Sequence, residues 1–359
     1  MQRSDWLNRA SRNRLRRVVD VFTYPLKVED FLGLVDPLAS SKQLRGVVTR
    51  VEPETPTSVT ITFRPGRGWT GHDAGQWVRI GVEIDGVRHW RSYSLSSAAD
   101  GEPQVTVTSI GRVSEHLVTR TRVGDVWYLD LAQGEFTLPT GPRPLLMITA
   151  GSGITPVMSM LRTLVGRRHD ADVVVLHSAR TRDESLFTDE LEGLAARHPG
   201  LCVVHRFTHN EGRLDLSDAA ELNRLVPDWR RRAAYVCGPA GLLDDAQALW
   251  ATAGADDALT VERFTPPVAD DAAAQGGTAS FTTSGKDVDT DGTRPLLEVA
   301  EDAGILMRSG CRMGICRTCL TPLAAGRVRD LTTGEVHGDE GELIRTCVSA
   351  AAGDVRLIC

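Results

Sequence analysis

Four cysteines near the end of the sequence have the spacing of ligands to an iron–sulfur cluster. Cys311, Cys316 and Cys319 form a C-x4-C-x2-C run, and Cys347 follows alone after a long gap. This is the plant-type [2Fe–2S] pattern, in which four thiolates bind two irons. Glycines inside and beside the run let the loop wrap closely and aim amide N–H groups at the sulfurs. The spacing therefore predicts a [2Fe–2S] centre.

Zinc and disulfides explain these cysteines less well. A structural zinc site more often uses two close cysteine pairs, whereas the fourth cysteine here stands alone. The total of seven cysteines is odd, and the N-terminus is too charged for a secretory signal. Cys202 lies in an apolar run and is expected to be a buried strand residue. Cys359 is expected to be a free thiol without an assigned role.

Two glycine turns suggest a nucleotide site. Residues 151–156, Gly-Ser-Gly-Ile-Thr-Pro, lie between an apolar run and a helical stretch. A glycine turn at that point lets the backbone approach a pyrophosphate at a helix N-terminus. Residues 237–239, Cys-Gly-Pro, repeat the pattern after a later apolar run. Ligands of an open parallel sheet bind at the carboxyl ends of its strands, so both turns are expected on one edge. A tight strand–helix turn without a ligand is the alternative for either motif alone.

A third motif, Arg91-Ser92-Tyr93-Ser94, suits a flavin. It combines a cation for phosphate, an aromatic face for the isoalloxazine ring and small hydroxyl groups for the ring's polar atoms. Taken alone, the motif is more typical of an ordinary strand with an exposed tyrosine.

The surrounding pattern predicts elements that could position these motifs. Residues 42–141 read as short strands between Gly and Pro turns, which is typical of a small barrel or sandwich. From residue 142 onward, apolar strands alternate with helices, which predicts a parallel sheet covered on both faces. Residues 265–277 lack periodicity and are expected to be a linker. The cysteines lie in the segment after it.

The net charge, the absence of long apolar runs and the first 41 residues narrow the class and location of the protein. A net charge of −6 over 359 residues disfavours a nucleic-acid partner. No apolar run reaches the roughly 18 residues of a membrane span, and a cytoplasmic location is expected. Residues 1–41 are rich in arginine, with a helical apolar stripe at Leu15, Val18, Val19 and Phe22. Packing of this basic helix on a neighbouring domain is favoured, and peripheral contact with the inner face of the membrane is left open.

In this order the motifs resemble the ferredoxin–NADP reductase superfamily. The similarity is to fused members that serve bacterial oxygenases and acyl desaturases, and it covers about residues 42–359. The resemblance implies an antiparallel β-barrel flavin domain, an α/β parallel-sheet nucleotide domain and an α+β β-grasp ferredoxin domain. The expected organisation is a basic helical leader at 1–41, a flavin-binding domain at 42–141, an NAD(P)H-binding domain at 142–264, a linker at 265–277 and a [2Fe–2S] ferredoxin-like domain at 278–359.

The resemblance also implies roles for individual residues. Tyr93 would stack on the flavin, Arg91 would bind its phosphates, and Ser94 would face the ring near N5, with Ser92 beside them. Ser114 looks like a second phosphate donor, at a helix start. The nucleotide loop would use Gly151, Gly153, Thr155 and Pro156, and the nicotinamide would lie near Cys237, Gly238 and Pro239. Glu262 resembles the acid of an E-x-F motif beside the flavin. The expected catalytic set is Tyr93, Ser94, Cys237 and Glu262.

The choice of cofactors follows in part from the residues after the second apolar strand. Ser178, Arg180 and Arg182 offer a hydroxyl and two guanidiniums, which suit a ribose 2′-phosphate. NADPH is therefore favoured over NADH, and pairing of Arg182 with a nearby surface acid is the alternative. FAD is favoured over FMN from the wider similarity.

The resemblance implies an electron-transfer reductase. Electrons would pass from NAD(P)H through a flavin and a [2Fe–2S] cluster to a terminal oxygenase or a fatty-acyl desaturase. A redox-sensing module is the alternative from another class. A reductase for a Rieske dioxygenase or a P450 is the enzymatic alternative.

Overall fold

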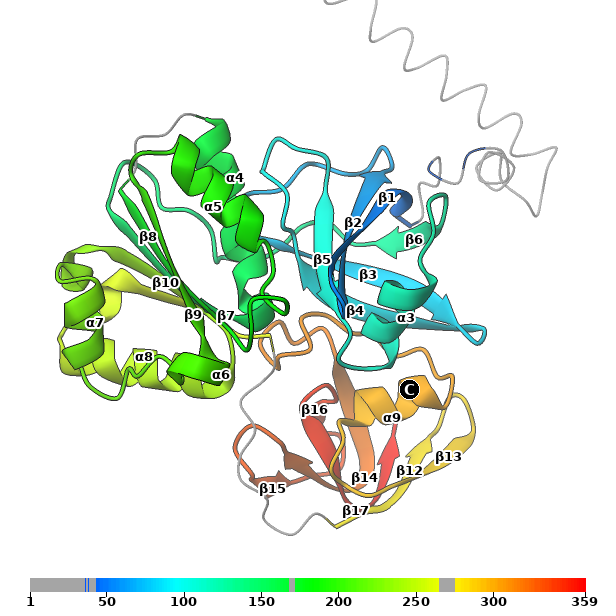
Figure 1. Ribbon diagram of the computed structural model, residues 1–359. Coiled ribbons are helices and arrows are strands. Elements are labelled where there is room, and N and C mark those ends of the chain that lie inside the picture. The colour runs from blue at the N-terminus through cyan, green and yellow to red at the C-terminus, as the bar shows by residue number, and fades with distance from the viewer. Residues whose placement is uncertain (1–35, 37, 39–42, 168–171, 265–274) are drawn as a thin grey trace, which may run out of the picture.

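The computed structural model describes residues 36, 38, 43–167, 172–264 and 275–359, which form three domains in chain order (Figure 1). The predicted leader, apart from residues 36 and 38, and residues 265–274 of the predicted linker lie outside the described residues. Among the described residues, no helix is both long and apolar enough to cross a membrane.

The first domain is an antiparallel barrel. Its elements are β1 (Arg45–Thr55), β2 (Ser58–Pro65), β3 (Trp77–Ile84), β4 (Val87–Ser94), β5 (Gln104–Thr108), α3 (Arg112–Arg120) and β6 (Val126–Leu129). The strand order is β4-β3-β6-β1-β2-β5, and an antiparallel bridge from Leu95 to Val105 joins the two outer strands. Ile61, Phe63 and Ile80 fill its interior. The Arg-Ser-Tyr-Ser motif therefore lies on β4, a strand held by β3 along its whole length.

The second domain is a parallel sheet between two layers of helices. It runs β7 (Leu145–Ala150), η2 (Gly151–Gly153), α4 (Ile154–Gly166), β8 (Val173–Ala179), α5 (Thr188–Arg197), β9 (Leu201–Phe207), α6 (Thr208–Glu211), α7 (Ala220–Leu225), η3 (Trp229–Arg231), β10 (Ala233–Cys237), α8 (Ala240–Thr252), η4 (Asp256–Ala258) and β11 (Leu259–Glu262). The order is β11-β10-β7-β8-β9, with every pair parallel.

Alternate residues of these strands face opposite layers. Met147 and Val175 pack on the side of α4 and α5, whereas Ile148 and Leu176 pack on the side of Trp229 and α8. Apolar residues therefore occupy both faces, as the continuous apolar runs predict. The expectation for Cys202 is wrong: this residue is exposed, because β9 forms the edge of the sheet.

The third domain is the β-grasp unit. Its elements are β12 (Gly277–Phe281), β13 (Lys286–Thr290), α9 (Leu296–Asp302), β14 (Leu320–Asp330), β15 (Val336–His337), β16 (Leu343–Arg345) and β17 (Ser349–Leu357). The sheet order is β13-β12-β17-β14-β15, and β16 pairs with β14. Leu296 and Leu297 of α9 pack into the core with Phe281 and Leu357. The loop between α9 and β14 carries three of the four cysteines, and Figure 1 shows α9 lying beneath α3 and β4 of the barrel.

Candidate active site

The barrel presents the predicted flavin motif at the end of β4. Ser94 is buried, and Tyr93 sits opposite Val78 of β3, partly enclosed. Burial raises the pKa of the Tyr93 phenol, so it stays neutral at physiological pH. The Ser92 hydroxyl is buried with no hydrogen-bond partner. Buried polar atoms normally have partners, so an orphan hydroxyl in this motif fits a polar ligand atom that completes it.

A carboxyl, a thiol and a hydroxyl meet where the barrel touches the nucleotide domain. Cys237 of β10 pairs in register with Glu262 of β11, and Glu262 is hydrogen-bonded to Ser94. Burial raises the pKa of Glu262 to about 8, against the lowering effect of that bond. Its Oε2 is buried without a partner. Burial, and secondly the neighbouring Glu262, raise the pKa of Cys237 well above its usual value. At neutral pH all three groups are therefore largely uncharged, an environment suited to an uncharged, flat ring system.

The two predicted nucleotide turns touch each other at the carboxyl edge of the sheet. A side chain at Gly153 would collide with the carbonyl oxygen of Cys237, so only glycine permits this approach. Gly151 has φ of 54°, in the left-handed region. Thr155 is buried, and its hydroxyl donates to the carbonyl of Ser152 at 2.9 Å.

The neighbouring residues of both turns begin helices. Pro156 lies in the first turn of α4, where a missing N–H removes no helical bond. Pro239 is the N-cap of α8, and Gly238 packs against Ala150 at the end of β7. Both helices thus point their N-termini at the shared edge, as a pyrophosphate site requires.

Ser114 has a structural role in the barrel. Its hydroxyl donates to the carbonyl of Gly111 at 2.9 Å and accepts the amides of Ile110 and Gly111 at 3.0 Å each. It therefore closes the first turn of α3.

The three residues predicted to read a 2′-phosphate are separated. Arg182 forms ion pairs with Asp189 at 3.1 Å and Glu192 at 2.9 Å, both on α5. Arg180 is 73% exposed and reaches Glu184 only at 4.0 Å. Only Ser178 lines a cavity of about 120 Å³ beside the ends of β8 and β9.

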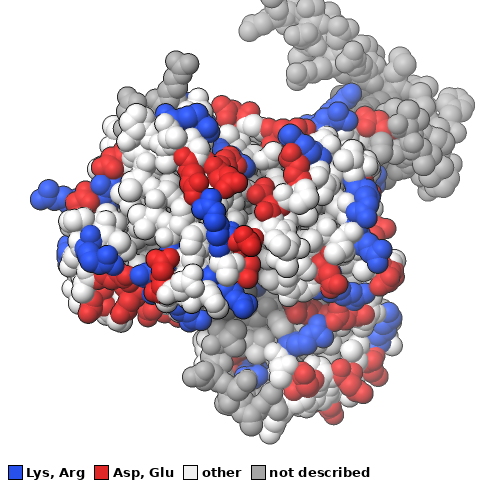
Figure 2. Space-filling model, in the orientation of Figure 1, with Lys and Arg blue, Asp and Glu red and all other residues white. Residues whose placement is uncertain are grey.

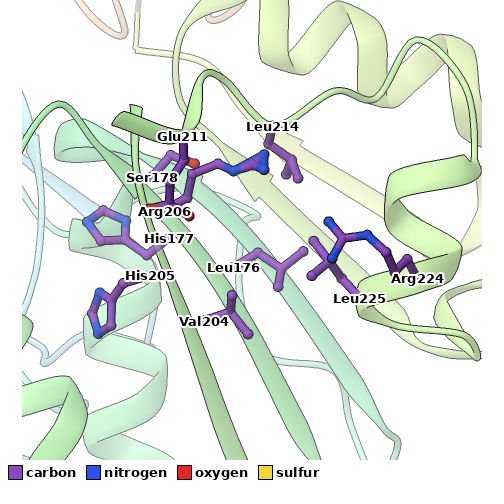
Figure 3. A pocket seen from close by; sticks show the side chains of 10 residues that line it. All are labelled: Leu176, His177, Ser178, Val204, His205, Arg206, Glu211, Leu214, Arg224 and Leu225. Atoms are coloured by element: carbon purple, nitrogen blue, oxygen red, sulfur yellow. The ribbon is translucent and has the colours of Figure 1, made fainter. Parts of the chain in front are cut away.

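Sequence reasoning missed two arginines that line this cavity with Ser178. Figure 3 shows Arg206 reaching between Ser178 and Leu214, with Arg224 across the space. Arg206 and Arg224 share the carboxylate of Glu221, at 2.6 and 3.2 Å. Glu211 also lines the cavity, so two guanidiniums there face two carboxylates, and the cavity offers the Ser178 hydroxyl and guanidinium N–H groups as donors. The register of the parallel strands could have pointed to Arg206, because Arg206 on β9 pairs with Ser178 on β8.

The four predicted metal ligands form two pairs. The Cys311 and Cys316 amides each donate to the other's sulfur, at 3.2 and 3.4 Å, and the sulfurs of Cys319 and Cys347 lie 3.2 Å apart. Within the described residues, no three His, Cys, Asp or Glu side chains surround one point as ligands of a single ion would. A side chain at Gly310 would collide with the Cys316 sulfur. Two thiolate pairs, with amides aimed at sulfur, fit a cluster of two irons.

Comparisons with known proteins identify two families and several relatives. Residues 147–248 match the family described as oxidoreductase NAD-binding domain, and residues 281–352 match the 2Fe-2S iron-sulfur cluster binding domain. The chain is 45% identical to an NADPH oxidoreductase of Mycobacterium tuberculosis, over 95% of this chain and 90% of that protein. It belongs to the fused reductases of the ferredoxin–NADP reductase superfamily. The predicted family, and its electron-transfer activity from NAD(P)H through a flavin and a [2Fe–2S] cluster, are confirmed.

Two further matches cover most of the reductase. The glycine betaine monooxygenase reductase subunit of Pseudomonas aeruginosa is 29% identical, over 78% of this chain and 85% of that one. The solved structure of phthalate dioxygenase reductase, described as a modular structure for electron transfer from pyridine nucleotides to [2Fe–2S], superposes with a TM-score of 0.67. The match covers 88% of this chain and 97% of that one at 22% identity. The match to phthalate dioxygenase reductase confirms the predicted fold of all three domains.

Proposed function

We propose that this reductase oxidises NADPH, uses FAD, and delivers electrons one at a time from its [2Fe–2S] cluster to a terminal oxygenase or a fatty-acyl desaturase. The meeting of Ser94, Glu262 and Cys237 carries the proposal, because it joins the flavin strand to the nicotinamide edge. When bound, a flavin supplies the conversion of two-electron hydride chemistry into one-electron steps, and the cluster accepts electrons singly.

The protein's own residues bind and orient these groups. Arg91 and the N-terminus of α3 at Ser114 would hold the flavin phosphates, Tyr93 would pack on the ring, and the free Ser92 hydroxyl would bond to it. Protonated Glu262 would hold Ser94 in place and keep negative charge away from Cys237.

The remaining predicted residues would place the nucleotide and the cluster. The turns at Gly151, Gly153, Thr155 and Pro156 and at Gly238 and Pro239 would receive the pyrophosphate and nicotinamide of NADPH. Two thiolate pairs would each bind one iron: Cys311 with Cys316, and Cys319 with Cys347. The predicted domain limits, 42–141, 142–264 and 278–359, remain those we propose.

The preference for NADPH has a different basis from the one that the sequence suggested. The cavity is lined by Ser178 and Arg206, which offer a hydroxyl and guanidinium N–H groups for a 2′-phosphate, and Arg180, two residues after Ser178 in the chain, is exposed. Arg182 already has two acidic partners. The Mycobacterium tuberculosis relative is described as an NADPH oxidoreductase, which supports the same choice.

An oxygenase is the favoured acceptor because two relatives are described as reductases of a monooxygenase and a dioxygenase. A desaturase, the cytoplasmic location and a peripheral membrane contact of residues 1–41 stay predictions.

Steady turnover tests the proposal against the redox-sensing alternative. The purified protein, with flavin and iron determined per chain, should reduce ferricyanide and cytochrome c continuously with NADPH. It should also show the electron paramagnetic resonance (EPR) signal of a reduced [2Fe–2S] centre. A single reduction without turnover would favour a sensor instead.

A further inference from the structure

A buried carboxylate joins the ferredoxin domain to the flavin strand. Glu301, on α9, is 3% exposed. Its Oε2 accepts a bond from the Arg91 guanidinium at 3.1 Å, and its Oε1 accepts a bond from Arg312. Arg91 belongs to β4 of the barrel, and Arg312 directly follows the cluster ligand Cys311. One side chain thus links the strand of the flavin motif to the loop of the cluster.

Both arginines are held closely at this point. The Arg312 side chain is 13% exposed, and its backbone has φ of 61°, a left-handed conformation that a non-glycine residue rarely adopts. The Arg91 guanidinium also donates to the carbonyl of Trp90 at 2.9 Å. Both positive charges act on the Tyr93 phenol, so the link lies beside the residue proposed to pack on the flavin.

Other contacts between the two domains lie around this link. Arg79 of β3 donates to the Ser309 hydroxyl at 2.9 Å, close to the cluster loop. Arg112 of α3 reaches Asp302 at 3.6 Å, and both of these side chains are substantially exposed. Figure 2 shows acidic and basic side chains adjoining where the lower domain meets the barrel. Exposed pairs contribute little and are screened by salt, whereas the bonds of the buried Glu301 carboxylate are screened much less.

A buried carboxylate between two guanidiniums is weak evidence for stability, because desolvating it offsets much of the attraction. Its effect is directional: Arg312 belongs to the same domain as Glu301, but the bond from Arg91 forms only when the barrel and the ferredoxin domain are docked in this position. We propose that Glu301 is a positioning residue, which holds the cluster loop against the flavin strand so that electrons pass between the two cofactors. This rests on the flavin and cluster sites proposed above. In the step that it serves, one electron leaves the reduced flavin and one ferric iron of the cluster becomes ferrous. Glu301 itself exchanges neither an electron nor a proton.

The test compares Glu301→Gln with Asp302→Asn in the full-length protein carrying both cofactors. Asp302 is the next residue of the same helix, but it is exposed and pairs at the surface. Reduction of the cluster by NADPH is followed in an anaerobic stopped-flow experiment. In Glu301→Gln its rate should fall about tenfold or more, because a tenfold smaller fraction of docked protein requires a loss of only about 1.4 kcal/mol in docking free energy. Added salt should slow it further, whereas the wild type and Asp302→Asn should resist salt. Reduction of ferricyanide, flavin content and iron content should not change.

Small-angle scattering supplies a readout that does not depend on turnover. Glu301→Gln should be more extended than the wild type at high salt, because the charged bond from Arg91 is lost and exposed pairs and the Arg79–Ser309 hydrogen bond then hold the ferredoxin domain. Wild-type cluster reduction and wild-type scattering in Glu301→Gln would overturn the proposal. If Glu301→Gln loses a cofactor, Glu301→Asp is tested in its place, because it keeps the charge on a shorter side chain. Wild-type rates of cluster reduction in Glu301→Asp would also overturn the proposal. A wild-type protein lacking flavin, or lacking the reduced-cluster signal, would instead refute the proposed function.

Discussion

Gly153 lies so close to Cys237 that any side chain at position 153 would collide with the Cys237 carbonyl oxygen. The contact joins the turn after β7 to the end of β10, which are neighbouring parallel strands. The obstacle is backbone, which cannot rotate away as a side chain could. The close contact of the two turns at the proposed nucleotide site therefore requires that residue 153 has no Cβ atom.

Gly153→Ala should consequently separate the two turns and weaken nucleotide binding. We expect the KM for NADPH to rise about tenfold or more, a loss of roughly 1.4 kcal/mol per factor of ten, while the flavin spectrum persists. Gly166→Ala is the matched control, since Gly166 ends α4 and a side chain there meets open space. Steady-state kinetics with both variants measure this, and an unchanged KM in Gly153→Ala would show that the turns need not touch.

The cysteine pairs predict that each of the four ligands is needed. Changing any one of Cys311, Cys316, Cys319 and Cys347 to Ser should abolish the EPR signal of the reduced [2Fe–2S] centre, because each iron would lose one of its two thiolates. Reduction of ferricyanide should survive. Cys202→Ser, on the exposed edge strand, is the control and should keep the signal. An intact signal in Cys347→Ser would remove the assigned fourth ligand.

Local spacing explains what the sequence could predict. The cysteine run, the glycine turns and the Arg-Ser-Tyr-Ser motif each act through neighbours in the chain, and all of them lie where strand and loop patterns put them. The partners of Arg182 could not be foreseen, because they depend on how α5 packs beside β8. Arg206 depends on strand register, and Glu301 on the docking of two domains. The prediction that Cys202 is buried is wrong because an apolar run does not distinguish an edge strand from a central one.

Two arginines are proposed to discriminate between nucleotides: Arg206, which lines the cavity beside Ser178, and Arg180, which is exposed two residues after Ser178. Arg206→Ala and Arg180→Ala should each raise the KM for NADPH far more than that for NADH. One lost charge-assisted bond costs about 1.5–3 kcal/mol, or roughly ten- to a hundredfold. Arg182→Ala should have little effect, since Arg182 does not line this cavity and pairs with Asp189 and Glu192 on α5. Equal losses with both nucleotides would mean that these residues do not read the 2′-phosphate.

Glu262 predicts a pH dependence of stability. Its folded pKa of about 8 lies above the value of about 4.3 expected in an unfolded chain, so the folded state binds the extra proton between these limits. The contribution is present in full below about pH 4.3 and falls as pH rises toward 8, by at most about 1.4 kcal/mol per unit. Urea unfolding measures the free energy of unfolding of the wild type and of Glu262→Gln at each pH. The difference between the two should fall as pH rises toward 8 and become independent of pH above that value. A constant difference across that range would mean that Glu262 is ionised in the folded protein.

A truncation ending at Phe264 tests the order of electron flow. The barrel and the nucleotide domain have their own cores, and the described contacts of the ferredoxin domain with the barrel are largely polar. The fragment should therefore fold, bind flavin and oxidise NADPH with ferricyanide, a small acceptor that reaches the flavin directly. It should fail with the partner oxygenase or desaturase, which is expected to draw electrons from the cluster. Full activity with that partner would make the flavin the true donor. A fragment that cannot fold would show that the ferredoxin domain supplies packing as well as the link through Glu301.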